Sequence, residues 1–294
     1  MMLIEELLHT KSCSVVGLEK NTGKTVTLNY LLQHLPPTHR VAVTSIGLDG
    51  EQKDQVTGTA KPEITLFQGM LFATSEKHYR QRRLQSEILD ISDESTALGR
   101  LVTARVLTEG KILLSGLGST LALKRWMNKI ESKTDLILVD GALSRMSLAS
   151  PTISESLILA TGAAYSANIE TLVRKTKHIV DLTRLPLYEG DIAEDSIIEI
   201  QGAVTDRTLN LILNDPEAHG KALLIQDFTR VFADEMLWHQ FTKTHSVYVR
   251  HKSRLIGVTV NPKAPNGMVL DSKTLCKKIE EAIEIPTIDL MNNE

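Results

Sequence analysis

The sequence is poor in cysteine, with only Cys13 and Cys276 among 294 residues, so neither a disulfide framework nor a CxxC pair for redox chemistry or zinc is present. It also lacks a net charge of one sign. The 33 basic and 36 acidic residues give a formal charge of −3, which provides no electrostatic case for nucleic-acid binding. The first residues, MMLIEELLH, are too few to span a bilayer and carry acids where a targeting leader would carry basic residues. We therefore expect a protein of the reducing cytoplasm, without nucleic-acid or membrane partners.

Short apolar runs alternate with segments of helical periodicity along most of the chain. Strands are predicted at 14–17, 41–45, 64–67, 111–115, 136–140, 156–161, 197–201, 222–226, 246–249 and 255–260. Helices are predicted at 24–35, 98–107, 120–130, 168–185, 207–213, 229–242 and 272–283. Because strands that are apolar on both faces form parallel sheets covered on both sides, this pattern predicts an α/β fold: a mainly parallel sheet flanked by helices on both faces. We expect one domain over 1–294, with an insertion or edge hairpin after the second strand at about 50–95 and a weak subdomain junction at about 185–195.

The stretch GLEKNTGKT, residues 17–25, follows an apolar strand and opens an amphipathic helix. Gly23 permits close approach of the backbone, Lys24 supplies a charge for outer phosphates, and Thr25 supplies a hydroxyl for Mg²⁺. A turn that merely favours glycine does not account for the adjacent Lys-Thr pair. The stretch therefore predicts the phosphate-binding loop (P-loop) of an NTPase, with one residue more than the usual G-x-x-x-x-G-K-[ST] spacing. Its predicted nucleotide contacts are Gly17, Glu19, Lys20, Asn21, Thr22, Gly23, Lys24 and Thr25.

Carboxylates at the ends of predicted strands are candidates for the rest of such a site. Asp140 ends the apolar strand in LILVDGAL, where a carboxylate can hold Mg²⁺ in a P-loop protein. Asp49, in TSIGLDGE, is a second candidate for the metal or the attacking water, with an ordinary turn as the alternative. Arg145 is a candidate for transferred phosphate charge, although a surface salt bridge is its simpler role. The run from Asp215 to His219, DPEAH, spaces three metal ligands but has no other support.

The longer loop resembles that of dethiobiotin synthetase and related ATPases in the MinD-like and signal-recognition-like branch of P-loop proteins. Its core, KNTGKT, also resembles the KNSGKT loop of MobB. Several members of that branch work as dimers, which leaves a homodimer possible here. In those ATPases an asparagine or proline loop contacts adenine, so the resemblance implies base contacts by Asn261 and Pro262 in VTVNPKAPNG. A plain Asn-Pro turn is the alternative.

Several stretches together resemble the KamB-like family, ATPase subunits of the reactivase that serves adenosylcobalamin-dependent lysine 5,6-aminomutase. They are GLEKNTGKTVTLNYLL, TSIGLDGE, STALGRLVTARVL, VDGALSRMSLASP, LILATGAA and VTVNPKAPNG. The resemblance implies ATP and Mg²⁺ as cofactors, a KamC-like second subunit as partner, and an aminomutase client. No D-x-H-x-x-G cobalamin signature is present, so nothing indicates corrin binding by this chain. Two functions stay open: an ATPase that opens a client enzyme, and a metabolic ATPase of dethiobiotin-synthetase type that acts on a small carboxylate.

Overall fold

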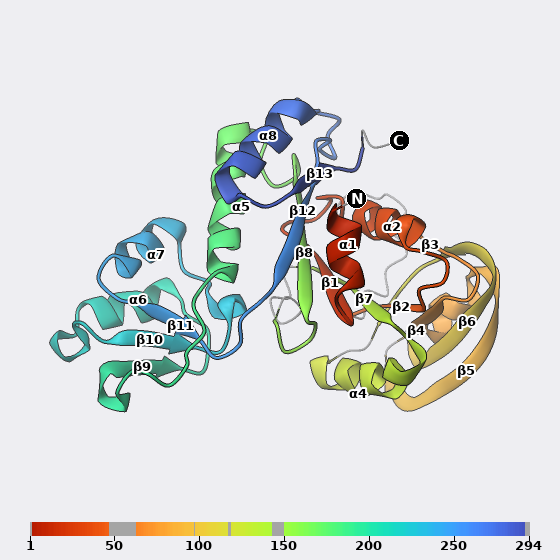
Figure 1. Cartoon of the computed structure of the whole chain (residues 1–294), viewed down its shortest axis with the longest axis horizontal. Coiled ribbons are helices and arrows are strands. Elements are labelled where there is room, and N and C mark those ends of the chain that lie inside the picture. Colours follow the sequence, from red (N-terminus) through yellow and green to blue (C-terminus); the bar gives the residue numbers. More distant parts are fainter. Residues whose placement is uncertain (1, 47–62, 97, 117–118, 143–149, 292–294) are drawn as a thin grey trace.

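The protein is described here from a computed structural model, which places residues 2–46, 63–96, 98–116, 119–142 and 150–291. These residues form a ten-stranded sheet with helices against it, and a separate three-stranded sheet lies to one side (Figure 1). The predicted α/β class, with a mostly parallel central sheet flanked by helices, is therefore confirmed. Within the described residues, no helix combines the length and the apolar character that crossing a bilayer requires.

The large sheet is parallel through its centre and antiparallel at one end. Its strands are β1 (Ser12–Gly17), β2 (Val41–Ser45), β3 (Ile64–Leu66), β4 (Leu71–Ser75), β5 (Arg83–Thr96), β6 (Gly99–Ile112), β7 (Leu136–Ala142), β8 (Ser156–Gly162), β12 (Leu255–Asn261) and β13 (Thr287–Asp289). Their order is β13-β12-β8-β1-β7-β2-β4-β6-β3, with β5 paired to β6. Every neighbouring pair from β13 to β4 is parallel, whereas β6 runs antiparallel to β3, β4 and β5.

Helices cover both faces of this sheet, as the doubly apolar strands predicted. On one face, α1 (Met2–Leu8) and α2 (Lys24–His34) share a buried cluster with alternate strand residues such as Val15 and Leu138. On the other face, α4 (Thr120–Ile130) packs on residues such as Val139. The same face carries α5 (Ile169–Thr183) and α8 (Ser272–Ile283), which pack on residues such as Val16. Successive strand residues thus face opposite layers, and both layers are apolar.

The predicted helix at 98–107 is wrong, because these residues belong to β6. The predicted strand at 111–115 is only the end of the same element. Strand β6 is held by hydrogen bonds to β4 and β5, and its successive residues bury into two different cores: Leu101 toward α4, and Val102 toward the α1–α2 face. The indole N–H of Trp126 in α4 also donates to the Thr103 hydroxyl at 3.0 Å. These tertiary contacts override a local sequence, LGRLVTARVL, whose spacing suits a helix.

The described part of the predicted insertion or edge hairpin, residues 63–95, is largely regular structure. It holds β3, β4, the short helix α3 (Glu76–Arg80) and most of β5, which pairs with β6 in a long hairpin. Strand β4 is fully buried and pairs directly with β2, so part of this segment completes the central sheet instead of standing outside it.

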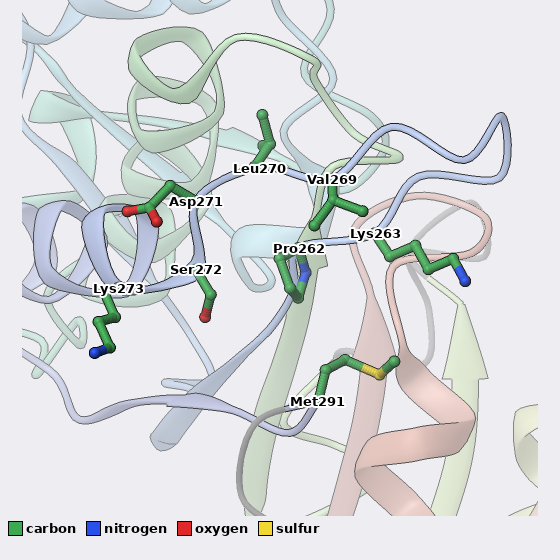
Figure 2. A pocket seen from close by; sticks show the side chains of 8 residues that line it. All are labelled: Pro262, Lys263, Val269, Leu270, Asp271, Ser272, Lys273 and Met291. Atoms are coloured by element: carbon green, nitrogen blue, oxygen red, sulfur yellow. The ribbon is translucent and has the colours of Figure 1, made fainter.

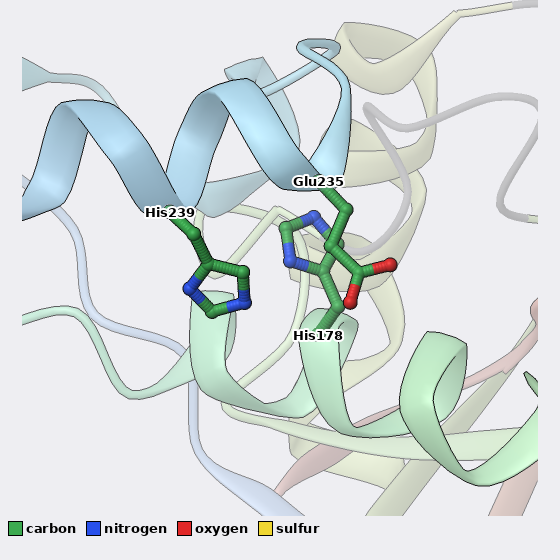
Figure 3. Close-up of side chains that lie close together, drawn as sticks. All are labelled: His178, Glu235 and His239. Atoms are coloured by element: carbon green, nitrogen blue, oxygen red, sulfur yellow. The ribbon is translucent and has the colours of Figure 1, made fainter. Parts of the chain in front are cut away.

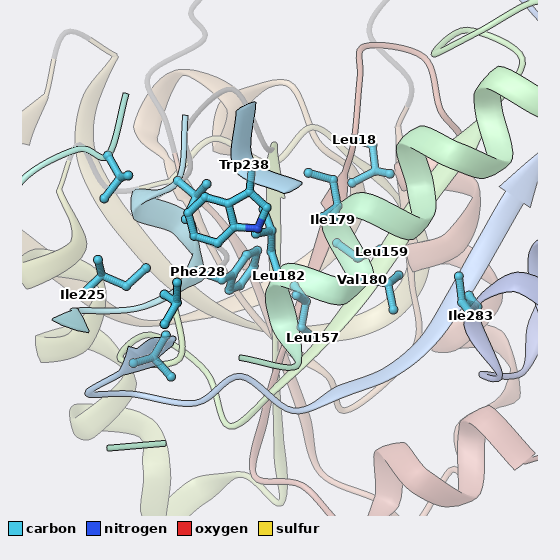
Figure 4. Packing of buried hydrophobic residues seen from close by; sticks show 14 of the residues in the cluster. Leu18, Leu157, Leu159, Ile179, Val180, Leu182, Ile225, Phe228, Trp238 and Ile283 are labelled. Atoms are coloured by element: carbon cyan, nitrogen blue, oxygen red, sulfur yellow. The ribbon is translucent and has the colours of Figure 1, made fainter. Parts of the chain in front are cut away.

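The smaller sheet follows the 185–195 segment. It consists of β9 (Ile197–Ile200), β10 (Ala222–Ile225) and β11 (Val247–Val249), all parallel, with α6 (Asp206–Leu213) and α7 (Glu235–Thr242) beside it. One apolar cluster joins it to the large sheet: Leu157 and Leu159 of β8 belong to the same core as Phe228 and Trp238 (Figure 4). Helix α5 lies between the two sheets and contributes Ile179 and Val180 to this core.

Candidate functional site

The large sheet changes its winding direction at β1. From β1 the chain crosses through α2 to β2, on one side of β1 in the sheet. From β8, on the other side of β1, it continues through α5 and the smaller sheet to β12, farther out in the opposite direction. In open α/β sheets, ligands bind beyond the carboxyl ends of the strands at such a switch point. The segment that leaves β1 here is residues 17–25, the loop singled out by its sequence.

The loop is closed by its own contacts. The Thr22 hydroxyl donates to the carbonyl oxygen of Glu19 at 2.8 Å, which holds a compact turn. A Cβ atom on Gly17 would lie 2.9 Å from that hydroxyl, so the turn needs glycine there. Asn21 and Gly23 adopt positive φ angles of 64° and 93°, conformations in which glycine is unstrained and asparagine is tolerated. The buried Thr22 side chain therefore shapes the loop, and its predicted ligand contact can come only from the backbone.

The loop presents unpaired backbone donors at the start of α2. Gly23 caps the helix without any side-chain hydrogen bond. Among the described residues, the N–H groups of residues 21–25 donate no hydrogen bond of regular geometry. The N-terminus of a helix carries partial positive charge, and orphan N–H groups bind anions. The loop thus has the donors that a phosphate group requires.

Lys24 and Asp140 are brought together across two elements. The register places Asp140 of β7 opposite Val15 of β1, and the Lys24 ammonium nitrogen lies 3.1 Å from Asp140 Oδ1. Both side chains are mostly buried, with 25% and 12% of their surfaces exposed. Asp140 Oδ1 is itself buried and accepts no hydrogen bond of regular geometry from any residue that the structure describes. A buried carboxylate oxygen without a hydrogen bond suits a cation, and its position beside Lys24 suits a metal held against a phosphate.

The other predicted nucleotide contacts differ in exposure and in the hydrogen bonds that they already make. Glu19 and Lys20 are exposed, and the Glu19 carboxylate accepts a hydrogen bond from the Lys20 N–H at 2.8 Å. Thr25, in the first turn of α2, makes no hydroxyl hydrogen bond to a described residue. Asp49 and Arg145 lie outside the described residues, so their roles stay predictions.

Asn261 contacts the loop and braces it. Its side-chain N–H donates to the carbonyl oxygen of Asn21 at 3.2 Å, and its side-chain oxygen accepts from the Lys263 N–H at 3.0 Å. Its Cβ atom lies so close to Gly23 that a Cβ on the glycine would sit 2.9 Å away. The amide is thus engaged at both ends within the protein. Base reading by Asn261 stays a prediction, and in this structure its amide holds the loop in place.

A surface pocket of about 740 Å³ lies beside this brace (Figure 2). Its lining residues are Pro262, Lys263, Val269, Leu270, Asp271, Ser272, Lys273 and Met291. Met291 also lies in a tightly packed crevice that Thr22 and Gly23 of the loop line, so it borders both the pocket and the loop. Its volume falls within the roughly 300–1,000 Å³ of ligand pockets. The sequence indicated Pro262 only, because the other lining residues come from a turn, a helix start and the C-terminal segment.

Tyr165 is a further residue near the loop that sequence reasoning missed. It follows β8, and its N–H donates to the Gly162 carbonyl oxygen at 2.8 Å. Burial, followed by the negative charges of Glu19 and Glu235, raises the pKa of its hydroxyl. The ammonium group of Lys175 lies 4.9 Å from its ring centroid. Tyr165 therefore lies within electrostatic range of Glu19 in the loop and of Glu235 in α7, and its ring contacts Lys175 of α5.

Comparison of the chain with protein-family models, curated proteins and solved structures finds no match. The resemblances noted from the sequence therefore stay predictions.

Proposed function

We propose that this chain is a P-loop NTPase that binds Mg²⁺-ATP through residues 17–25 and hydrolyses it. The observation that carries the proposal is the Lys24–Asp140 pair, 3.1 Å apart at the switch point of the sheet, beneath an uncapped helix N-terminus. A glycine turn with only a structural role requires neither the lysine, nor the buried carboxylate, nor the unpaired N–H groups. Together these groups match the charges of a triphosphate and its metal.

Each group has a distinct role in this proposal. The N–H groups of residues 21–25 hold phosphate oxygens, and Lys24 turns from Asp140 to the outer phosphates. The Thr25 hydroxyl and the Asp140 carboxylate would hold Mg²⁺, with Asp49 as a further candidate. A bound Mg²⁺ would neutralise the charge that develops on the transferred phosphoryl group. The adjacent pocket at Pro262 and Lys263 accommodates the nucleoside, which rests on the segment that Asn261 braces.

Isothermal titration calorimetry of the purified chain with Mg²⁺-ATP tests the proposal. We expect Lys24→Ala to abolish measurable binding, because it removes the charge held against the outer phosphates. Thr25→Ala should weaken binding more with Mg²⁺ than without it. Lys11→Ala is the matched control. Lys11 immediately precedes β1, is exposed, and pairs only loosely with Glu131, at 3.9 Å. Equal ATP affinity in folded Lys24→Ala and wild type would refute nucleotide binding at this loop.

On the resemblance to the KamB-like family, we further propose that the ATPase serves a reactivase. Together with a KamC-like subunit, it would hold open an aminomutase that retains damaged cobalamin. Shifting a client from 1:99 to 99:1 in favour of the open form takes about 5.5 kcal/mol of differential binding. The test is recovery of inactivated lysine 5,6-aminomutase given fresh adenosylcobalamin, ATP, Mg²⁺ and both subunits. Equal recovery with wild type and Lys24→Ala would refute this role. ATP turnover on a small carboxylate without any protein partner would instead support the metabolic alternative.

A further inference from the structure

Three side chains outside the loop converge between α5 and α7. His178 projects from α5, and Glu235 and His239 project from α7 toward it (Figure 3). One ligand atom from each lies within 4.8 Å of the others. Glu235 and His239 are four residues apart in one helix and therefore lie on the same face.

The chemical state of this trio favours metal binding. Two of the three groups are histidines, and the neutral imidazole is a common metal ligand in proteins. The two imidazole rings contact each other with centroids 6.1 Å apart, and within the described part of the chain neither ring makes a hydrogen bond. Glu235 forms an ion pair with Arg174 through Oε2. Its carboxylate has two oxygens, so one can keep the arginine while the other binds a cation.

We propose that His178, Glu235 and His239 form a site for a divalent transition metal, with Zn²⁺ as the ion of choice. Two imidazoles and one carboxylate are a ligand set that binds zinc, with a fourth position left for water or another ligand. Ligand atoms about 2.1 Å from a tetrahedral ion lie about 3.4 Å from one another. Small side-chain rotations would bring the three ligand atoms, now within 4.8 Å of one another, to that separation. Mg²⁺, which prefers oxygen ligands, does not suit the two histidines.

The site joins the two halves of the protein. Helix α7 packs on the smaller sheet through Trp238 and Phe241, whereas α5 packs on the large sheet. A metal held by both helices therefore ties the smaller sheet to the larger one. Ions that bind only the folded state stabilise it in proportion to their free concentration, so Zn²⁺ should raise the melting temperature.

The signal in the sequence was a Glu-x-x-x-His pair without a neighbouring third ligand. The run Asp215–His219 has the more compact spacing, but its side chains do not form a metal group among the described residues. There, Asp215 Oδ1 accepts a hydrogen bond from the Glu217 N–H and caps a short turn. The third ligand of the proposed site came from a distant helix, which spacing could not reveal.

Equilibrium dialysis of the tag-free chain against Zn²⁺, in millimolar Mg²⁺ to occupy oxygen-rich sites, tests the proposal by metal analysis. We expect one Zn²⁺ per chain in the wild type. His178→Ala and His239→Ala should each lower Zn²⁺ affinity by about 100-fold or more, since losing even an outer-shell partner costs 10–100-fold. His219→Ala, which removes an exposed histidine of the rejected run, should leave affinity unchanged.

A second readout separates metal binding from a change in folding. Co²⁺ in place of Zn²⁺ should give tetrahedral visible absorption bands in the wild type that are lost in His239→Ala, which removes an exposed ring. Lys24→Ala should retain both the Zn²⁺ stoichiometry and the Co²⁺ bands, because this site does not depend on the nucleotide loop. Substoichiometric Zn²⁺ in the wild type, or undiminished affinity in His239→Ala, would overturn the proposal.

Discussion

Asp140→Asn separates the two roles that Asp140 plays in the proposed site. Without nucleotide, its Oδ1 pairs with Lys24 at 3.1 Å, and this contact competes with phosphate for the lysine and with Mg²⁺ for the carboxylate. Asparagine keeps the size of the side chain and removes its charge. We therefore expect Asp140→Asn to bind Mg²⁺-free ATP more tightly than the wild type, to gain little affinity from added Mg²⁺, and to hydrolyse ATP more slowly.

The size of the effect follows from the geometry. Two unit charges 3.1 Å apart attract by roughly 5 kcal/mol at an effective dielectric constant of about 20. Desolvation and side-chain ordering offset most of this attraction, and partial exposure of both groups screens it further. We take about 1–2 kcal/mol as the net contribution of the pair. Its loss corresponds to an increase of about 5- to 30-fold in affinity for Mg²⁺-free ATP.

Calorimetric titration with ATP, in EDTA and then in excess Mg²⁺, measures both effects. Asp135→Asn is the matched control. Asp135 immediately precedes β7, at the end of the strand far from the loop, and it pairs with Arg40. It should change neither the affinity nor its dependence on Mg²⁺. If Mg²⁺ raises the affinity of Asp140→Asn as much as that of the wild type, or if Mg²⁺-free binding weakens, Asp140 is not the metal carboxylate. Wild-type hydrolysis in this variant would lead to the same conclusion.

Four further predictions concern the loop and the thiols. Gly23→Ala should lower the free energy of unfolding by about 2–4 kcal/mol in urea titrations, because alanine is strained at φ 93° and its Cβ would clash with Asn261. An unchanged urea midpoint would contradict this prediction. Asn261→Ala should weaken ATP and GTP binding alike by loosening the loop, as measured by competition titration, whereas a change confined to the ATP-to-GTP ratio would show that Asn261 reads the base. Burial raises the pKa of Cys13 to about 12 and that of Cys276 to about 11, so neither thiol should react quickly with a disulfide reagent at pH 8 until urea is added. The folded state favours the protonated thiols, so the free energy of unfolding should stay constant below pH 9, the ordinary thiol pKa. It should fall as the pH rises toward 11–12. A urea midpoint that stays constant between pH 9 and 12 would contradict this prediction.

Local patterns in the sequence predicted the α/β class and the parts of the candidate site that lie within one segment. The strand at 41–45 and the helices at 120–130 and 272–283 match β2, α4 and α8 at both ends. Residues 17–25 join β1 to α2 as predicted, and Asp140 lies near the carboxyl end of β7. These features depend on apolar periodicity, on glycine and on helix starts, which neighbouring residues along the chain decide.

The features that the sequence missed depend on residues far apart in the chain. Residues 98–107 became a strand because β4, β5 and α4 surround them, although their own spacing suits a helix. Asn261 donates to Asn21 across 240 positions, a contact set by the order of β12, β8 and β1 in the sheet. His178 meets Glu235 and His239 only because α5 and α7 pack beside a shared core. The sequence by itself determined the α/β class, segments such as β2, α4 and α8, and the loop at the centre of the sheet. Strand order, register and helix packing decided which side chains meet. Those contacts arise from the burial of apolar surface across the whole chain, and residue spacing within one segment does not encode them.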